Sequence, residues 1–376
     1  IKEKHKLCKN KNHLNPYFSG IAYDIQDASE KIMVHLGKDI QKKIKSKNLC
    51  LAGGVALNSV ANKKLYDAAN FKKMFVFPAC SDAGLPFGLA LWGAVNKYCK
   101  NKKFKINFDN AYTGKNYSNL EINNLLKKFK IKSKKNEDDE VASLLSKGKI
   151  FGRLSEASEY GPRALGNRSI LADPRNVKMR DYINEKVKHR EVFRPFAPSV
   201  LEDEYNKHFD LKTISPYMLL VAKSKKPNII PSAIHIDGTA RVQTVSKIQN
   251  KKFYNLIKAF HKITKVPILL NTSFNDAGEP LVETPLDALL CFLKTKIDYL
   301  IIEDKLIYRP KNSKKIIKKL ETFRNKLIIN REKLLLKKFM KSFSHKEFLI
   351  RRKNENKLAI YEAIYKPSKI FCTILE

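Results

Sequence analysis

The sequence is short of glycine and acidic residues, and it contains no long apolar run. Only 14 of its 376 residues are glycine, and 74 basic residues stand against 37 acidic ones, which gives a net charge of +37. No apolar stretch approaches the roughly 18–20 residues that a bilayer span requires, so we exclude a transmembrane protein. The first residues include no apolar segment typical of a signal peptide, and we expect a cytoplasmic protein. Because the first residue is not Met, we also expect an incomplete reading frame.

Cysteine occurs in no arrangement that indicates a disulfide framework or a zinc site. The six cysteines include no CxxC pair. We therefore expect free thiols in a reducing compartment. The positions are Cys8, Cys50, Cys80, Cys99, Cys291 and Cys372.

The positive charge is mostly lysine, spread along the whole chain. Of the 74 basic residues, 61 are Lys, often in pairs beside Asn and Ile. We interpret this excess as a compositional drift that coats solvated faces of the protein. We therefore do not expect nucleic acid as the partner, although a dedicated nucleic-acid surface stays the open alternative.

Arginine, in contrast, is concentrated in one part of the sequence. None precedes Arg153, and seven fall within the 42 residues 153–194. A planar guanidinium grips a phosphate or a carboxylate with two parallel hydrogen bonds, which Lys cannot do. The concentration therefore indicates anion-binding positions, with structural ion pairs as the alternative.

The order of the predicted elements indicates an α/β chain of two domains with a basic helical tail. The first domain covers 1–100, a linker 101–114, the second domain 115–310 and the tail 311–376. Helices are expected at 21–47, 55–69, 85–98, 120–129, 137–146, 253–264 and 285–295. Strands are expected at 48–52, 73–77, 149–151, 199–201, 218–222, 242–245, 267–270 and 299–302. The strand–helix alternation of the first domain predicts parallel strands.

Two motifs of the first domain place small residues at the ends of predicted strands. Gly53 and Gly54 end a strand and open a helix, so their bare backbone N–H groups suit a nucleotide phosphate, and Asn58 adds a polar contact. A tight strand–helix turn is the alternative. Asp82 lies at the carboxyl end of the next strand, where a lone carboxylate can ligate a hard cation. A helix N-cap is the alternative for Asp82.

The stretch 152–175 carries Arg163 and Arg168 among Gly and Pro residues. We interpret it as one irregular, rigid anion-binding loop. Four basic residues follow closely and extend the same positive site: Lys186, Lys188, Arg190 and Arg194.

Two further motifs place hydrogen-bond donors beside predicted strands. Arg241 lies in the segment 237–244, and Ser273 and Asn275 follow the strand 267–270. These side chains can donate to phosphate oxygens or orient a small planar substrate. The sequence has no Ser–His–Asp arrangement, no Walker A lysine motif and no HxxxH pair.

Six blocks of sequence together resemble the NodU/CmcH-type O-carbamoyltransferase family. They follow one another in the family's order between about residues 20 and 310. The blocks read AGGVALNSVAN, PACSDAG, GPRALGNRSILADPR, VKHREVFRPFAPSVL, HIDGTARVQTV and VPILLNTSFNDAGEPLVETPLDAL. The resemblance implies that residues 1–100 are the C-terminal remnant of a Kae1-like domain of ASKHA fold. It implies a YrdC-like α/β domain at 115–310.

The resemblance also implies a reaction in two steps that uses ATP and a divalent metal. The YrdC-like site makes carbamoyl-adenylate from carbamoyl phosphate and ATP, and the Kae1-like site then transfers the carbamoyl group to a hydroxyl of a small-molecule acceptor. The implied catalytic residues are Arg163, Lys188, Arg194, Arg241 and Ser273. The implied substrate or ATP contacts are Gly53, Gly54, Asn58, Gly84, Arg168 and Asn275, with Asp82 as a ligand of a metal of the Fe or Mg class.

One departure from the family pattern limits what we expect of this chain. The family's metal site also uses two His of an HxxxH motif from the first half of the Kae1-like domain, and that half is absent from this sequence. Asp82 therefore lacks its partner ligands, and we expect the chain alone to perform at most the adenylation step. A tRNA threonylcarbamoylation enzyme and an inactive nucleotide-binding remnant stay as alternatives. We also allow for a homodimer.

Overall fold

The computed structural model describes residues 15–44, 46–98, 108 and 110–342. The chain divides into two compact units, residues 1–311 and 312–376. In the second unit the structure describes helix α11 (Ser313–Ser342). Residues 343–376 of the predicted tail lie outside the described residues, as do 101–107 and 109 of the predicted linker. Among the described residues, no helix is both long and apolar enough to cross a bilayer.

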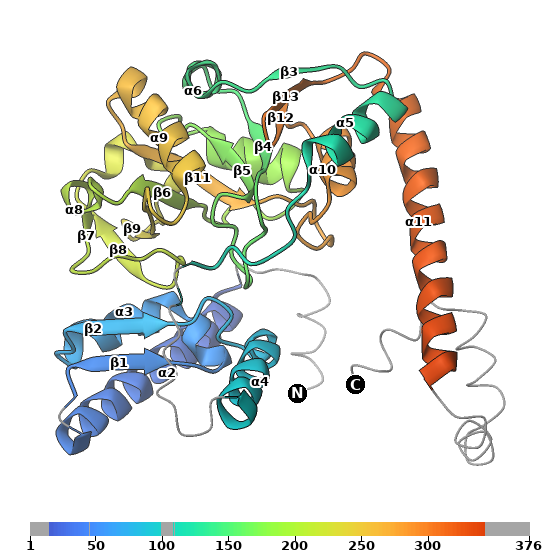
Figure 1. The fold of residues 1–376 in the computed structure, drawn as a ribbon. Helices are drawn as coiled ribbons and strands as arrows, with labels where there is room; N and C mark the ends of the chain where they lie inside the picture. Colours follow the sequence, from blue (N-terminus) through green and yellow to red (C-terminus); the bar gives the residue numbers. More distant parts are fainter. Residues whose placement is uncertain (1–14, 45, 99–107, 109, 343–376) are drawn as a thin grey trace. The chain divides into compact units, whose positions relative to one another are not determined.

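The N-terminal elements of the first unit include a two-stranded parallel sheet (Figure 1). In chain order these elements are α2 (Pro16–Ile44), β1 (Asn48–Leu51), α3 (Ser59–Ala68), β2 (Lys73–Val76) and α4 (Leu85–Gly93). Strands β1 and β2 pair in parallel, as the strand–helix alternation predicts. Helix α2 packs closely on α3. A Cβ at Gly37 of α2 would overlap the side chain of Leu65 of α3, so this close approach requires glycine.

Helices α2 and α4 leave apolar side chains exposed. On α2 these include Tyr23 and Ile25, and on α4 they include Leu89 and Trp92. No residue of α4 is buried in the described structure. Parallel sheets normally have both faces covered. This part of the unit therefore carries uncovered apolar surface.

A mixed eight-stranded sheet forms the centre of the first unit. In spatial order its strands are β10 (Gln243–Val245), β6 (Ala197–Leu201), β11 (Ile268–Ser273), β5 (Arg168–Ala172), β4 (Phe151–Leu154), β12 (Tyr299–Ile302), β13 (Lys305–Tyr308) and β3 (Ser133–Lys135). The pairs β10–β6 and β12–β4 are parallel, and the other neighbours are antiparallel. A smaller antiparallel sheet contains β7 (Phe209–Asp210), β8 (Val221–Ser224) and β9 (Thr239–Arg241).

Helices pack on the large sheet and enclose its core. The helices of this part are α5 (Asn119–Lys128), α6 (Asp138–Ser146), α7 (Met179–Tyr182), α8 (Tyr205–His208), α9 (Lys251–Thr264) and α10 (Pro285–Lys294). Leu145 of α6 and Phe260 of α9 share one apolar cluster with Phe151 of β4 and Ile301 of β12. Helix α10 contacts β4 and β12, and none of its residues belongs to that cluster.

The mixed α/β class is confirmed, but the prediction of one irregular loop over 152–175 is wrong. That stretch contains two fully buried strands, β4 and β5, and only the segment between them is irregular. Gly152 lies in β4, where the ring of Phe274 occupies the space that a Cβ would need. The Kae1-like and YrdC-like assignments and the four-part domain division stay predictions.

The cysteines that the structure describes are unpaired. Cys50 is exposed, and Cys80 and Cys291 are buried, all as free thiols. Cys8, Cys99 and Cys372 lie outside the described residues.

Candidate functional site

The segment between β4 and β5 carries Arg163 and is held by the carboxylate of Glu159. Glu159 Oε1 accepts hydrogen bonds from the backbone N–H groups of Leu165 and Asn167, both at 2.7 Å. The backbone path also depends on two glycines with positive φ, +123° at Gly161 and +119° at Gly166. Such a conformation favours glycine over any residue with a Cβ. We call residues 161–168 the arginine loop.

Side chains of the large sheet fix the middle of the arginine loop. Asn271 of β11 donates to the carbonyl of Ala164 at 3.2 Å, and Gln243 of β10 donates to that of Leu165 at 2.7 Å. The hydroxyl of Tyr112 donates to the same carbonyl at 3.0 Å. Buried carbonyl groups bonded in this way keep one conformation. The backbone next to Arg163 is therefore rigidly placed.

Arg163 is half-buried and lies beside the short helical turn Gly54–Leu57 of the N-terminal elements. We call Gly53 and this turn the glycine turn. The Nη2 of Arg163 donates to the carbonyl of Leu57 at 3.5 Å. Its Nε is buried and has no hydrogen-bond partner among the described residues. Burial lowers the pKa of Arg163, and Cys80 is the group that opposes this shift.

Arg163 and Arg190 both lie near enough to Arg241, at the end of β9, for their charges to act on it. Burial lowers the pKa of Arg241, and the charges of Arg163 and Arg190 lower it further. Buried nitrogens without a partner in the described structure are Nε of Arg241 and Nη2 of Arg190. Arg190 is held by a bond from its Nε to Asn184 Oδ1 at 2.7 Å and by the ring of Phe196, 4.8 Å from its Cζ. We call Arg163, Arg190 and Arg241 the arginine cluster.

Lys188 connects this cluster to the end of β11. Its Nζ donates to the carbonyl oxygens of Ser273 at 2.9 Å and Asn275 at 2.8 Å, and to the side-chain oxygens of both residues. Burial lowers the pKa of Lys188 to about 8, and the charges of Arg190 and Arg194 act in the same direction. The lysine is therefore held rigidly in a positive environment.

The structure brings together five of the sequence-predicted site residues. Lys188 bonds directly to Ser273 and Asn275, and Arg163 acts on Arg241 through its charge. These residues come from four separate segments of the chain.

Arg194 and Arg190 differ from the prediction in their positions. Arg194 lies at the edge with a largely exposed side chain 3.7 Å from Glu191, and it influences Lys188 only through its charge. Arg190 belongs to the predicted positive site, but no catalytic or binding role is predicted for it. Its place two residues after Lys188, inside the concentration of arginines, is the signal that points to it.

Arg168 points away from the arginine cluster. It is fully buried, and its Nη1 donates to the carbonyls of Ser155 and Glu156, both at 3.1 Å. Burial lowers its pKa, and the largest opposing charge is that of Glu159. In this position Arg168 braces the segment between β4 and β5.

The predicted site residues of the N-terminal elements have local structural roles. Gly53 has a φ of +96°, and its N–H donates to the carbonyl of Cys80 at 2.6 Å. Asn58 caps α3 by accepting from the N–H of Ala61 at 3.1 Å. Gly84 is required sterically, because a Cβ there would overlap the carbonyl of Ala79. Gly54 is exposed and begins the short helical turn Gly54–Leu57.

Asp82 does not by itself form a metal site. Its side chain is exposed at the start of the turn Asp82–Gly84. In the part of the chain that the structure describes, no group of three or more His, Cys, Asp or Glu residues is placed to hold a metal ion. The described residues therefore do not fit the implied metal, and we derive no chemical step through it.

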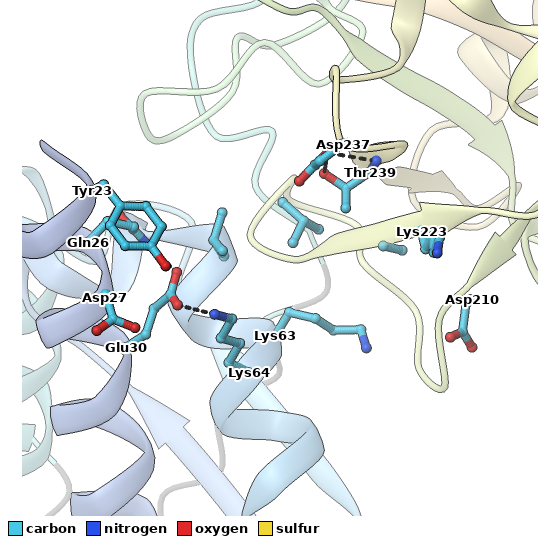
Figure 2. A pocket seen from close by; sticks show the side chains of 13 residues that line it. Tyr23, Gln26, Asp27, Glu30, Lys63, Lys64, Asp210, Lys223, Asp237 and Thr239 are labelled. Atoms are coloured by element: carbon cyan, nitrogen blue, oxygen red, sulfur yellow. Dashed lines mark hydrogen bonds and ion pairs between the residues drawn. The ribbon is translucent and has the colours of Figure 1, made fainter. Parts of the chain in front are cut away.

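A cavity of about 410 Å³ lies beside β9 and is shown in Figure 2. Glu30 and Lys64 form an ion pair at one side of it, and Asp237 bonds to Thr239 at the other. None of the predicted site residues lines the cavity. Thr239 in the cavity and Arg241 in the cluster are two residues apart on β9 and so share one face of the strand.

The chemistry that this arrangement allows is the binding of an anion. The groups that shift the pKa of Arg163 and Arg241 include no carboxylate. Buried charges without a partner are costly, and buried donors are normally satisfied. Neighbouring guanidinium groups that each keep one buried nitrogen without a protein acceptor favour a phosphate or a carboxylate as the missing partner.

Comparisons with known proteins relate both parts of the first unit to one family. The sequence model described as "Carbamoyltransferase N-terminus" matches residues 2–91, and the one described as "Carbamoyltransferase C-terminus" matches residues 142–309. The nodulation protein NolO of Bradyrhizobium diazoefficiens is 39% identical over 292 residues, which cover 75% of this chain and 53% of NolO.

Two uncharacterised proteins are similar to a comparable degree. The one from Synechocystis sp. is 40% identical over 315 residues, which cover 76% of this chain and 51% of the relative. The one from Methanocaldococcus jannaschii is 37% identical over 318 residues, which cover 81% of this chain and 52% of the relative. The chain thus spans about half the length of the curated relatives it matches.

Similarity to solved structures is weak. A crystal structure of full-length HypF in the phosphate- and nucleotide-bound form gives a TM-score of 0.33 at 16% identity, covering 48% of this chain and 23% of HypF. We base no argument on that similarity. The two matched segments and the relatives at 37–40% identity are sufficient to assign the family. The chain belongs to the carbamoyltransferase family.

Proposed function

We propose that the arginine cluster and Lys188 form the adenylation site of an ATP-dependent O-carbamoyltransferase. The substrates are carbamoyl phosphate and ATP, and the product of this site is carbamoyl-adenylate. Transfer to a hydroxyl of a small-molecule acceptor is the second step of the whole protein. The cytoplasmic location and the homodimer stay predictions.

The proposed first step balances when water cleaves carbamoyl phosphate to carbamate and inorganic phosphate. A carbamate oxygen then attacks the α-phosphorus of ATP, the bond to the β-phosphate oxygen breaks, and pyrophosphate leaves. Negative charge builds up on the phosphate oxygens during this displacement. Preorganised cationic donors aimed at those oxygens lower the barrier. Arg163, Arg190 and Arg241 are the groups we propose for this task.

A single observation carries the proposal: three half-buried arginines from separate segments each have one buried side-chain nitrogen that no described residue accepts. Arg168 also has two buried nitrogens without a partner among the described residues, although its Nη1 donates to backbone carbonyls. The cluster differs from Arg168 because the charges of Arg163 and Arg190 both act on Arg241. Ser273 and Asn275 hold the Lys188 ammonium and so orient a fourth positive charge. Contacts to ATP by Gly53, Gly54, Asn58 and Gly84, and to substrate by Arg168 and Arg194, stay predictions. We also propose Asp82 as one metal ligand, whose partners come from residues outside this chain.

The direct test is ATP–pyrophosphate exchange. Full-length protein is incubated with ATP, labelled pyrophosphate and carbamoyl phosphate, and labelled ATP is counted. We expect exchange only when carbamoyl phosphate is present. We expect Arg241→Gln to reduce it at least about 100-fold, because one charge-assisted contact at a reacting centre is worth roughly that factor.

The matched control for Arg241→Gln is Arg180→Gln. Arg180 belongs to the same concentration of arginines but forms an ion pair with Asp181 at 2.9 Å. Its replacement should leave exchange unchanged. Absence of exchange in the unaltered protein would reject the adenylation site and leave an inactive nucleotide-binding remnant.

A tRNA threonylcarbamoylation enzyme is the second candidate, and the net charge of +37 is the observation that favours it. This candidate predicts that turnover of ATP requires tRNA. Exchange at full rate in protein treated with ribonuclease would argue against it.

A further inference from the structure

We propose that Glu159 is a positioning residue that orients Arg163 toward the bound anion, an inference that rests on the proposed function of the arginine cluster. Glu159 does not touch the cluster itself. Its carboxylate acts through the backbone of the arginine loop, 161–168.

The geometry of Glu159 is that of an internal anchor. One oxygen, Oε1, accepts from three backbone N–H groups, those of Leu165 and Asn167 at 2.7 Å and that of Arg168 at 3.2 Å. A carboxylate that accepts backbone N–H groups forms charge-assisted bonds, which are roughly twice as strong as neutral ones. The side chain is only 7% exposed, so water cannot replace it.

The charge of Glu159 is matched by its surroundings. It is the largest charge that opposes the lowering of the Arg168 pKa. Its second oxygen, Oε2, is buried and has no partner among the described residues. The contribution of Glu159 therefore comes from its negative charge and from the hydrogen bonds that Oε1 accepts. A neutral side chain of the same size would leave Arg168 without the carboxylate that opposes the lowering of its pKa most strongly.

The position of Arg163 depends on this anchor, because the backbone on both sides of it is fixed. The residues next to it are fixed on the C-terminal side by Glu159, Gln243 and Asn271, which act on residues 164–168. On the N-terminal side, the backbone of Gly161 lies against the segment at Pro78, where a Cβ would come within 2.6 Å of the carbonyl oxygen. A shift of the loop would therefore move the guanidinium away from Arg241.

The test is a double-mutant cycle on anion affinity, with pyrophosphate as the probe. The four proteins are the unaltered chain, Glu159→Gln, Arg163→Gln and the double variant. We expect Glu159→Gln to weaken binding about 10-fold and Arg163→Gln about 10- to 100-fold, because each removes or misplaces one charge-assisted contact. If Glu159 acts through Arg163, the double variant binds within about 2-fold of Arg163→Gln alone.

A merely structural role predicts a different result in the cycle. The two effects would then multiply, and that outcome would overturn the inference. Circular dichroism gives the folded fraction of each variant, so that affinity is expressed per folded molecule. Should Glu159→Gln fail to fold, Glu159→Asp replaces it, since it retains the charge but withdraws the carboxylate by one methylene group.

Glu156→Gln is the matched control. This carboxylate lies three residues before Glu159, is half-buried and pairs with Lys252 at 3.5 Å. We expect its replacement to leave pyrophosphate affinity unchanged.

The assay also separates the role of Glu159 from the proposed adenylation reaction. Binding with a non-additive cycle but without ATP–pyrophosphate exchange rejects the proposed reaction and retains the role of Glu159. Absence of pyrophosphate binding by the unaltered chain rejects both.

Discussion

Lys188 is the residue on which the pH dependence of anion binding depends. Burial lowers its pKa from the ordinary 10.5 to about 8, so the ammonium loses its proton as the pH rises through 8. We expect the affinity for sulfate, whose own charge is constant in this range, to fall as the pH rises from 7 to 9. Isothermal titration at several pH values measures this, and Lys188→Met should remove the pH dependence between 7 and 9.

Lys188 affects the stability of the unbound protein in the opposite direction, so that stability rises with pH while anion affinity falls. In the unbound protein the unfolded state binds more protons at Lys188 than the folded state does between about pH 8 and 10.5. The contribution of Lys188 to the free energy of unfolding therefore increases as the pH rises across that window. A sulfate affinity that is flat from pH 7 to 9 would contradict a neutralised Lys188.

Gly161 is a second residue where a single atom decides the local structure. Its φ is +123°, and a Cβ would lie 2.6 Å from the carbonyl oxygen of Pro78. Gly238 also has positive φ, but nothing lies within 4 Å of its added Cβ. We expect Gly161→Ala to reduce the free energy of unfolding by about 2–4 kcal/mol and Gly238→Ala by about 1 kcal/mol. Urea unfolding measures both, and equal losses would show that the contact with Pro78 is unimportant.

At the scale of single elements, the start of α3 shows how a predicted binding residue has a structural task. Asn58 accepts from the N–H of Ala61 and exchanges hydrogen bonds with Gln26 of α2. We expect Asn58→Ala to lower the free energy of unfolding by about 1 kcal/mol in the absence of any nucleotide, because an N-cap is lost. Asn58→Asp keeps the capping oxygen and should lose less. Unchanged stability of Asn58→Ala would reject the capping role.

Elements with local signals could be predicted closely. The strand 299–302 agrees with β12, and the helix expected at 285–295 begins at Pro285, as α10 does. Thr284 and Asp287 form a capping box at this point, and Pro at the first helical position reinforces it. Strand β5 was missed, because it begins with a fully buried Arg168 that favoured a loop.

At the scale of the whole molecule, the net charge of +37 and the arginine cluster make different predictions for salt. Lysine on solvated faces binds polyanions by releasing counterions, which salt opposes strongly. We expect affinity for tRNA to fall about 100-fold or more between 50 and 200 mM salt. Pyrophosphate bound by buried groups should weaken less than about 10-fold, because buried charges are screened less. Filter binding measures both, and tRNA binding that resists salt would favour a nucleic-acid partner.

The amino-acid sequence by itself was sufficient for the mixed α/β class, the carbamoyltransferase family and many element positions. These properties depend on local periodicity, on capping residues and on long blocks of residue types. The sequence also indicated that arginine between 153 and 194 matters, but not which guanidinium groups meet.

Only the tertiary structure decided that Arg190 joins Arg163 and Arg241, while Arg194 lies at the edge and Arg168 turns toward backbone carbonyls. The loop that carries Arg163 is fixed by Gln243 of β10 and Asn271 of β11, whose places depend on how β5, β6, β10 and β11 pair across the sheet. Those pairings join residues that are far apart in the chain, and no local pattern of residues encodes them.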